Sequence, residues 1–162
     1  SYTIGIYYAS SGATYGFEVA NMISEKIVGE LETARSVSDP FISTDGKAIS
    51  FVDKDGVNVK ILSGSKAANT VNPNGSPKYV YYEYSYIDEE SVEKVIWEFD
   101  PKAYLGYTVD TMRFERLGEA YPENVIRLVM ILHNDRYGDY ERSYFIKCAN
   151  VDRILVESAE TP

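Results

Sequence analysis

One amphipathic helix near the N-terminus, followed almost entirely by strands, is the feature that most limits the folds open to this chain. Between residues 17 and 37, apolar side chains recur every three or four positions, and charged side chains lie between them. The apolar set is Phe17, Ala20, Ile23, Ile27, Leu31 and Ala34. Asp39-Pro40 follows, and a proline disfavours helix in the residue before it. The sequence therefore predicts one helix over 17–37, lying across a sheet.

The remainder of the chain carries the two-residue alternation and the turn residues of hairpins. The predicted strands occupy 47–53, 57–62, 78–88, 93–100, 107–116, 125–135 and 140–151. Asp55-Gly56 is a strong turn signal between the first two, because glycine adopts positive φ without strain. Segment 125–135 is the most apolar strand and is expected to be central. Residues 2–8 also have a β-prone composition, and 63–77 indicate a surface loop.

These elements predict an α+β fold with one long N-terminal helix packed on a mostly antiparallel β-sheet of about seven or eight strands. A length of 162 residues suits a single domain with a sizeable core. We expect that domain to span 1–162, with an N-terminal extension at 1–16, the helix at 17–37 and a β-sheet region at 47–157. The extension is predicted to be non-helical because Gly5, Gly12 and Gly16 each weaken a helix.

The charge of the chain argues against polyanionic partners. The formal net charge is −9, with an estimated pI near 4.6. Nucleic acids and anionic membrane surfaces attract positive charge, so neither is an expected partner. No run of 18 apolar residues occurs in the sequence, and contact with a membrane is therefore expected only through an N-terminal anchor outside it.

Residues typical of catalysis are sparse. His133 is the single histidine and Cys148 the single cysteine, so a histidine-based zinc site is not expected. The two residues fall on strands that could be neighbours, but His133 has the setting of a turn edge and Cys148 that of a buried, inert thiol. Asp53-Lys54-Asp55-Gly56 matches the start of a calcium loop, yet position twelve is Gly64 where a glutamate is needed. We therefore expect no catalytic residue, no metal site, no cofactor and no enzymatic activity.

Aromatic residues on the predicted strands form the one candidate binding surface. The chain has 15 Tyr, and tyrosine suits strands with one wet face because its ring packs while its hydroxyl reaches water. Tyr82, Tyr84 and Trp97 lie among acidic residues on strands 78–88 and 93–100, a composition that could stack against sugars. The competing interpretation is a half-exposed sheet face covered by tyrosines.

Several segments follow the order found in one known superfamily. The helix ends in Ala34-Arg35-Ser36-Val37, and a hairpin follows that contains Ile49-Ser50-Phe51 and Val57-Asn58-Val59. Later, Asn124-Val125-Ile126 begins a long strand, and Tyr144-Phe145-Ile146 leads to Asn150-Val151. This order resembles that of the type IV pilin and pseudopilin superfamily. In those proteins the helix continues from a hydrophobic membrane-spanning helix, which lies upstream of the segments compared here.

The resemblance implies a non-enzymatic structural or assembly subunit, such as a minor pilin or pseudopilin of a pilus or secretion filament. It implies an extracellular location at a bacterial cell surface. The expected partners are other pilin-like subunits or filament assembly components. The alternative left open by the residues is a carbohydrate- or ligand-binding β module of a bacterial surface protein, which would use Tyr82, Tyr84 and Trp97.

Overall fold

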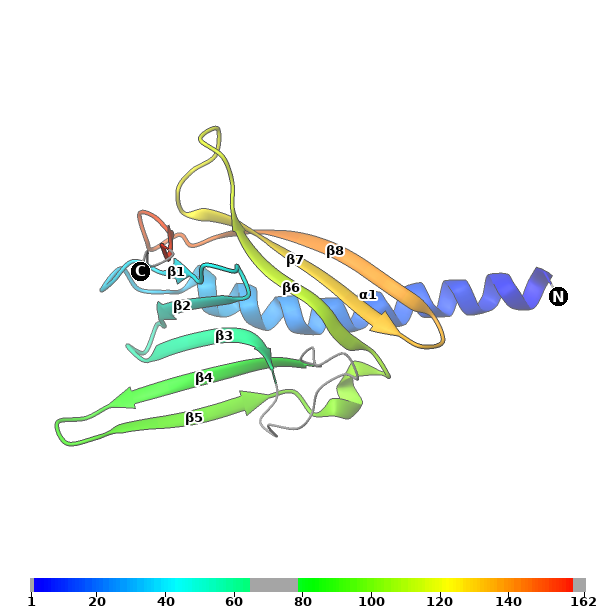
Figure 1. Ribbon diagram of the computed structural model, residues 1–162, viewed down its shortest axis with the longest axis horizontal. Helices are drawn as coiled ribbons and strands as arrows, with labels where there is room; N and C mark the ends of the chain where they lie inside the picture. The colour runs from blue at the N-terminus through cyan, green and yellow to red at the C-terminus, as the bar shows by residue number, and fades with distance from the viewer. Residues whose placement is uncertain (1, 65–78, 159–162) are drawn as a thin grey trace.

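A computed structural model combines, in the part of the chain that it describes, one long helix with nine strands; Figure 1 shows their arrangement. The structure describes the backbone of residues 2–64 and 79–158, and the side chains of residues 14–63 and 79–158. The elements in chain order are α1 (Tyr2–Glu32), β1 (Phe41–Ile42), β2 (Ala48–Val52), β3 (Asn58–Gly64), β4 (Tyr79–Ile87), β5 (Val92–Glu98), the 3-10 helix η1 (Pro101–Tyr104), β6 (Thr108–Arg116), β7 (Val125–Asn134), β8 (Gly138–Lys147) and β9 (Leu155–Val156). The loop predicted at 63–77 lies almost wholly outside the described residues.

The strands form two sheets, so the prediction of a single sheet of seven or eight strands is wrong. One sheet has six strands in the order β5-β4-β3-β2-β1-β9, and the other has three in the order β6-β7-β8. β1 and β9 run parallel, which makes the larger sheet mixed. With two residues each, these strands are too short to show an alternating pattern. The two predicted hairpins are present as β2–β3 and β4–β5, and β7 is central in its sheet as expected.

A short turn after β5 separates the two sheets. Pro101 begins η1, and the side chain of Asp100 accepts a hydrogen bond from the Lys102 amide at 2.9 Å, which caps the turn. Leu105 and Gly106 then both have positive φ, at 52° and 84°. This reversal carries the chain away from β5, so β6 pairs with β7 and starts the second sheet.

The helix begins earlier and ends earlier than the sequence predicts. Residues 2–8 are helical, not β-strand, and the described part of 1–16 is therefore not the non-helical extension that the glycines favour. Helix propensity is a weak constraint, since each glycine costs only about 1 kcal/mol relative to alanine. At the other end, α1 stops at Glu32 because Arg35 already pairs with β2, its amide donating to the Val52 carbonyl at 2.8 Å.

The apolar stripe of α1 packs into a core that both sheets share. Its buried residues join one hydrophobic cluster with residues of β2, β3, β4, β6, β7 and β8. The fully buried members from α1 are Ala20, Ile23, Ile27 and Leu31. Phe17, predicted to belong to this stripe, is instead 42% exposed, with the Arg142 guanidinium 4.9 Å from the centre of its ring. The first buried apolar side chain of α1 is therefore Val19, two residues later than predicted.

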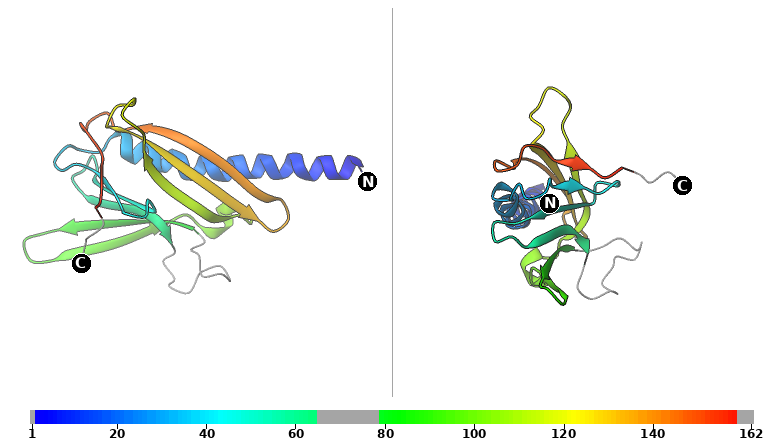
Figure 2. Two further views of the ribbon diagram at one scale, coloured as in Figure 1. Left: turned by 45° about the horizontal axis from the view of Figure 1, so that its top comes forward. Right: turned by 90° about the vertical axis from the view of Figure 1, so that its left-hand side faces the viewer.

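The N-terminal end of α1 projects beyond both sheets. At 1.5 Å per residue, its 31 residues extend for about 46 Å. Two views agree that this end passes the β7–β8 turn and continues away from the rest of the molecule (Figures 1 and 2). Only the C-terminal part of the helix is therefore fixed by the sheets.

Candidate functional site

The three aromatic residues singled out in the sequence come together beneath α1. Tyr82 and Tyr84 lie on β4, and Trp97 lies on β5 directly opposite Tyr82. The Tyr82 and Trp97 rings meet edge to face with centroids 5.3 Å apart. The ammonium nitrogen of Lys26, on α1, lies over the same rings. It is 4.2 Å from the centroid of the Trp97 ring, 4.8 Å from that of Tyr82 and 5.9 Å from that of Tyr84. Tyr82, Tyr84 and Trp97 thus form an aromatic cage on the two strands, and the cation bound in this cage is Lys26 of the helix.

A carboxylate from the next turn of α1 completes this site. Glu30 Oε1 lies 3.0 Å from Lys26 Nζ and accepts a hydrogen bond from the Tyr84 hydroxyl at 2.5 Å. The Lys26 and Glu30 side chains are 26% and 20% exposed, so water screens their attraction only in part. The lysine charge is therefore shared between one carboxylate and the faces of three rings, a setting that fixes the ammonium in place.

Burial also fixes the protonation of the tyrosines. Desolvation raises the pKa of Tyr82 and Tyr84 above the ordinary range, and the nearby charge of Glu30 adds to this effect. For Tyr84 the hydrogen bond to Glu30 acts in the same direction. Among the described residues, Tyr82 Oη and Glu30 Oε2 are buried without a hydrogen-bond partner. Each such atom costs about 1–3 kcal/mol of stability.

This placement leaves little of the cage open for stacking on a sugar. Tyr82 is completely buried and Tyr84 half-buried, while Trp97 is 38% exposed. The Lys26 ammonium lies over the rings that a ligand would need. The geometry favours a role in orienting α1 on β4 and β5. Sequence reasoning missed Lys26 and Glu30, although their i, i+4 spacing beside the apolar stripe was a usable signal.

A groove beside the cage has four acidic side chains in its lining. It lies between α1, the β2–β3 turn and β4, and its carboxylates come from Glu25, Glu30, Asp53 and Asp55. Asp53 serves the turn itself, since its Oδ1 accepts the amides of Asp55 and Val57, both at 2.9 Å. Across residues 14–63 and 79–158, no group of three or more His, Cys, Asp or Glu is placed to hold a metal ion.

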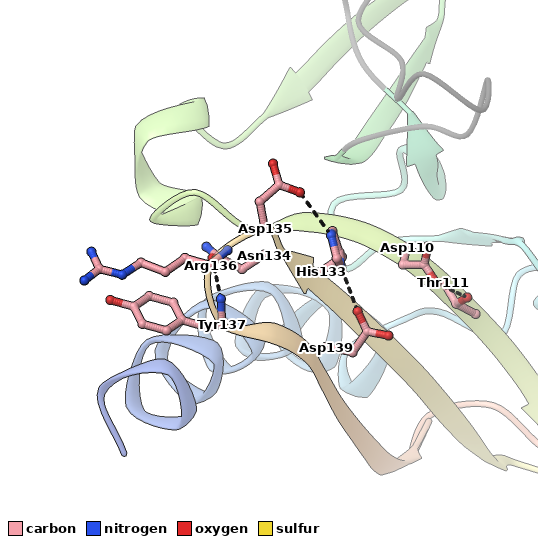
Figure 3. Close-up of polar contacts among 8 residues, drawn as sticks. All are labelled: Asp110, Thr111, His133, Asn134, Asp135, Arg136, Tyr137 and Asp139. Atoms are coloured by element: carbon pink, nitrogen blue, oxygen red, sulfur yellow. Dashed lines mark hydrogen bonds and ion pairs between the residues drawn. The ribbon is translucent and has the colours of Figure 1, made fainter. Parts of the chain in front are cut away.

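His133 lies between two carboxylates at the exposed end of β7 (Figure 3). Its Nδ1 is 2.7 Å from Asp139 Oδ1, and its Nε2 is 3.2 Å from Asp135 Oδ1. Asn134 organises the turn by accepting the amides of Arg136 and Tyr137 at 2.8 and 3.0 Å. The hydrogen bond to Asp139, followed by that to Asp135, raises the pKa of the imidazole. Both ring nitrogens of His133 thus contact carboxylates. This arrangement favours a structural role for a protonated imidazole in the turn over a role as a proton acceptor.

Cys148 and His133 do not meet, although their strands are neighbours. Asp139, opposite His133, lies near the start of β8, and Cys148 directly follows its end, about 30 Å away along an extended strand. Cys148 is completely buried, and burial raises the pKa of its thiol to about 12. The thiol therefore has the inert character expected from the sequence.

A second ion cluster, not foreseen from the sequence, crosses the exposed face of β6 and β7. Glu115 accepts from Arg113 Nε at 2.6 Å and from Arg127 Nε at 2.9 Å. The hydrogen bonds from Arg127 and then from Arg113 lower the pKa of the Glu115 carboxyl. Arg127 lies opposite Glu115 in the β6–β7 ladder, so the pair follows directly from the strand register.

Comparison with models of protein families, with curated proteins and with solved structures finds no match to this chain. Within the described part of the chain, no helix combines the length and the apolar character required to cross a membrane. Functional inference therefore rests on the geometry alone.

Proposed function

We propose that the chain is a structural subunit of a bacterial surface filament, built on the plan of a pilin or pseudopilin. The observation that carries the proposal is the projecting N-terminal end of α1, which leaves the sheets behind and continues as helix (Figures 1 and 2). A subunit that assembles through a helical core needs such an extension, whereas a self-contained binding module does not.

The composition of the projecting segment supports this proposal. Residues 1–17 contain no Asp, Glu, Lys or Arg, and the first charged residue is Glu18. A helix end that projects from the sheets and carries no charge is poorly suited to remain alone in water, because surface helices normally carry a charged face. Packing against the same segment of neighbouring subunits would cover it. The proposal includes an extracellular location and filament components as partners.

The Lys26 site fits this role as the device that fixes the direction of the helix. Its cage spans β4 and β5, and its cation comes from α1, so the helix cannot rotate about its axis without separating Lys26 from the rings. In a filament, the direction of the helix sets the position of each sheet domain relative to the assembly axis. A fixed helix direction would therefore give the sheet domain of every subunit the same orientation relative to the filament axis.

The test uses cells that express the chain from its own gene. Filaments are sheared from the surface, and the chain is detected in them by immunoblot and by immunogold electron microscopy. Ile6→Asp places a charge in the uncharged segment and should remove the chain from the filaments while thermal melting of the purified protein is preserved. Val37→Asp is the matched control, because Val37 is 74% exposed and lies after α1. Absence of the native chain from the filaments would refute the proposal, and so would equal incorporation of the two variants.

A further inference from the structure

The larger sheet ends in a strand that no other described element covers. β5 is terminal in the order β5-β4-β3-β2-β1-β9 and extends over seven residues without proline. Its exposed apolar side chains are Val92, Val95 and Trp97. An edge strand of this length presents a row of N–H and C=O groups on the side away from its neighbour in the sheet, which is a template for pairing with another strand. At the other end of the sheet, β9 has only two residues.

The hairpin geometry identifies which backbone groups of β5 point outward. The Asp88 amide donates to the Ser91 carbonyl at 3.0 Å and closes the β4–β5 hairpin. Hydrogen-bonded and non-hydrogen-bonded pairs alternate along an antiparallel ladder, and the β4–β5 register continues without a shift from this closing pair. The amides and carbonyls of Val92, Lys94, Ile96 and Glu98 therefore point away from β4.

Pairing of β5 with β5 of a second copy fits these outward groups in one register. A two-fold axis at Ile96 places the two Ile96 residues opposite each other and sets each Lys94 against the Glu98 of the other copy. All three residues carry outward backbone groups, so these are hydrogen-bonded pairs. Val95 then faces Trp97 of the other copy in the closer, non-hydrogen-bonded positions, where an aromatic and a β-branched side chain pack well.

Charge distinguishes this register from its neighbours. A two-fold axis at Lys94 would oppose two ammonium groups, and one at Glu93 would oppose two carboxylates. An axis at Val95 leaves Lys94 opposite Ile96 and Glu98 opposite Val92. The axis at Ile96 forms two Lys94–Glu98 ion pairs, on the same face as the Lys94–Glu83 pair within each chain, where Lys94 Nζ lies 3.2 Å from Glu83 Oε1. An axis at Trp97 would instead set Lys94 against Asp100, whose side chain already caps η1 by accepting the Lys102 amide.

We propose that β5 is a docking edge for a second copy of this chain, and that two copies join their six-stranded sheets through an antiparallel β5–β5 ladder centred on Ile96. This interface uses the edge of the sheet most distant from β9 and involves no residue of the projecting end of α1. It is therefore independent of the filament role proposed above.

Sedimentation equilibrium on the full chain tests the proposal. The native protein should approach twice the 18.3 kDa mass of one chain as its concentration rises. Lys94→Glu and Glu98→Lys each turn both ion pairs into like-charge pairs, so each should weaken the dimer by at least about tenfold. Lys54→Glu, an exposed substitution in the β2–β3 turn, makes the same charge change away from β5 and should leave the dimer intact.

Mixing the two charge variants gives the decisive result. In a heterodimer of Lys94→Glu with Glu98→Lys, the two substituted side chains attract at one end of the ladder, and native Glu98 faces native Lys94 at the other. An equimolar mixture should therefore regain the dimer that each variant alone has lost. The proposal is overturned if the native chain stays monomeric at the highest soluble concentration, if the charge variants leave association unchanged, or if the mixture remains monomeric.

Discussion

Gly16 of α1 packs so closely against Tyr140 of β8 that a Cβ at position 16 would lie 2.6 Å from Tyr140 Cγ. Real side chains do not approach this closely, so glycine is what allows the helix to meet the strand here. The contact lies where α1 begins to leave the sheets. Gly16, which lowers the helix propensity of this segment, is thus also the residue that lets α1 pack on β8.

This contact predicts opposite effects for the same substitution at two positions of α1. Gly16→Ala should lower the free energy of unfolding by about 1–2 kcal/mol, because overpacking outweighs the better helix propensity of alanine. Gly29→Ala should raise it by up to about 1 kcal/mol, since nothing lies within 4 Å of a Cβ at Gly29. Urea denaturation followed by circular dichroism measures both. Equal stability of the two variants would mean that α1 and β8 do not hold this contact in solution.

The two tyrosines of the Lys26 cage should also respond in opposite ways. Tyr82→Phe removes a buried hydroxyl without a partner among the described residues and should leave stability unchanged or raise it by about 1 kcal/mol. Tyr84→Phe removes the hydroxyl that donates to Glu30 and should lower stability by about 1–2 kcal/mol. Trp97 is the only tryptophan, so its fluorescence during urea unfolding reports on the cage directly. A loss of stability in Tyr82→Phe equal to that in Tyr84→Phe would show that the Tyr82 hydroxyl has a partner.

Local signals in the sequence predicted most of the strands, because hairpins are local structures. Asp55-Gly56 is the clearest case, as Gly56 has a φ of +80° at the turn that its sequence indicates. The division into two sheets could not be foreseen in the same way. It depends on the backbone at Leu105, a non-glycine residue with positive φ that no pattern marks.

The sequence predicts the aromatic half of the candidate site but not the half that α1 contributes. Tyr82, Tyr84 and Trp97 were found because aromatic residues concentrate on strands 78–88 and 93–100. Lys26 lies 56 residues before Tyr82 and meets it only through the packing of α1, so no local spacing joins the two. The start of α1 differs from the prediction for a related reason, since helix propensity does not express the close contact of Gly16 with Tyr140 on a distant strand.

Cys148 should behave as a protected thiol. Its complete burial and raised pKa of about 12 leave almost no thiolate near neutral pH. Labelling with a disulfide reagent should proceed only as fast as the protein opens, and it should reach one thiol per chain in denaturant. Ala149→Cys combined with Cys148→Ala is the matched control, because residue 149 is exposed and should react at once. Rapid labelling of the native chain would contradict the core placement of Cys148.

The pKa of His133 should lie above its ordinary value of about 6.5. The chain has one histidine, so a proton NMR titration needs no assignment. Asp139→Asn should reduce the pKa more than Asp135→Asn does, since Asp139 makes the closer contact, at 2.7 against 3.2 Å.

A raised folded-state pKa also fixes the direction of the effect on stability. The stabilisation from His133 is fully present below the unfolded pKa and is lost as the pH rises through the folded pKa. The melting temperatures of the native chain and of His133→Gln should therefore differ most near pH 5 and converge by about pH 9. A difference that grows with pH would show that the imidazole is neutral in the fold and that the two carboxylates do not hold its proton.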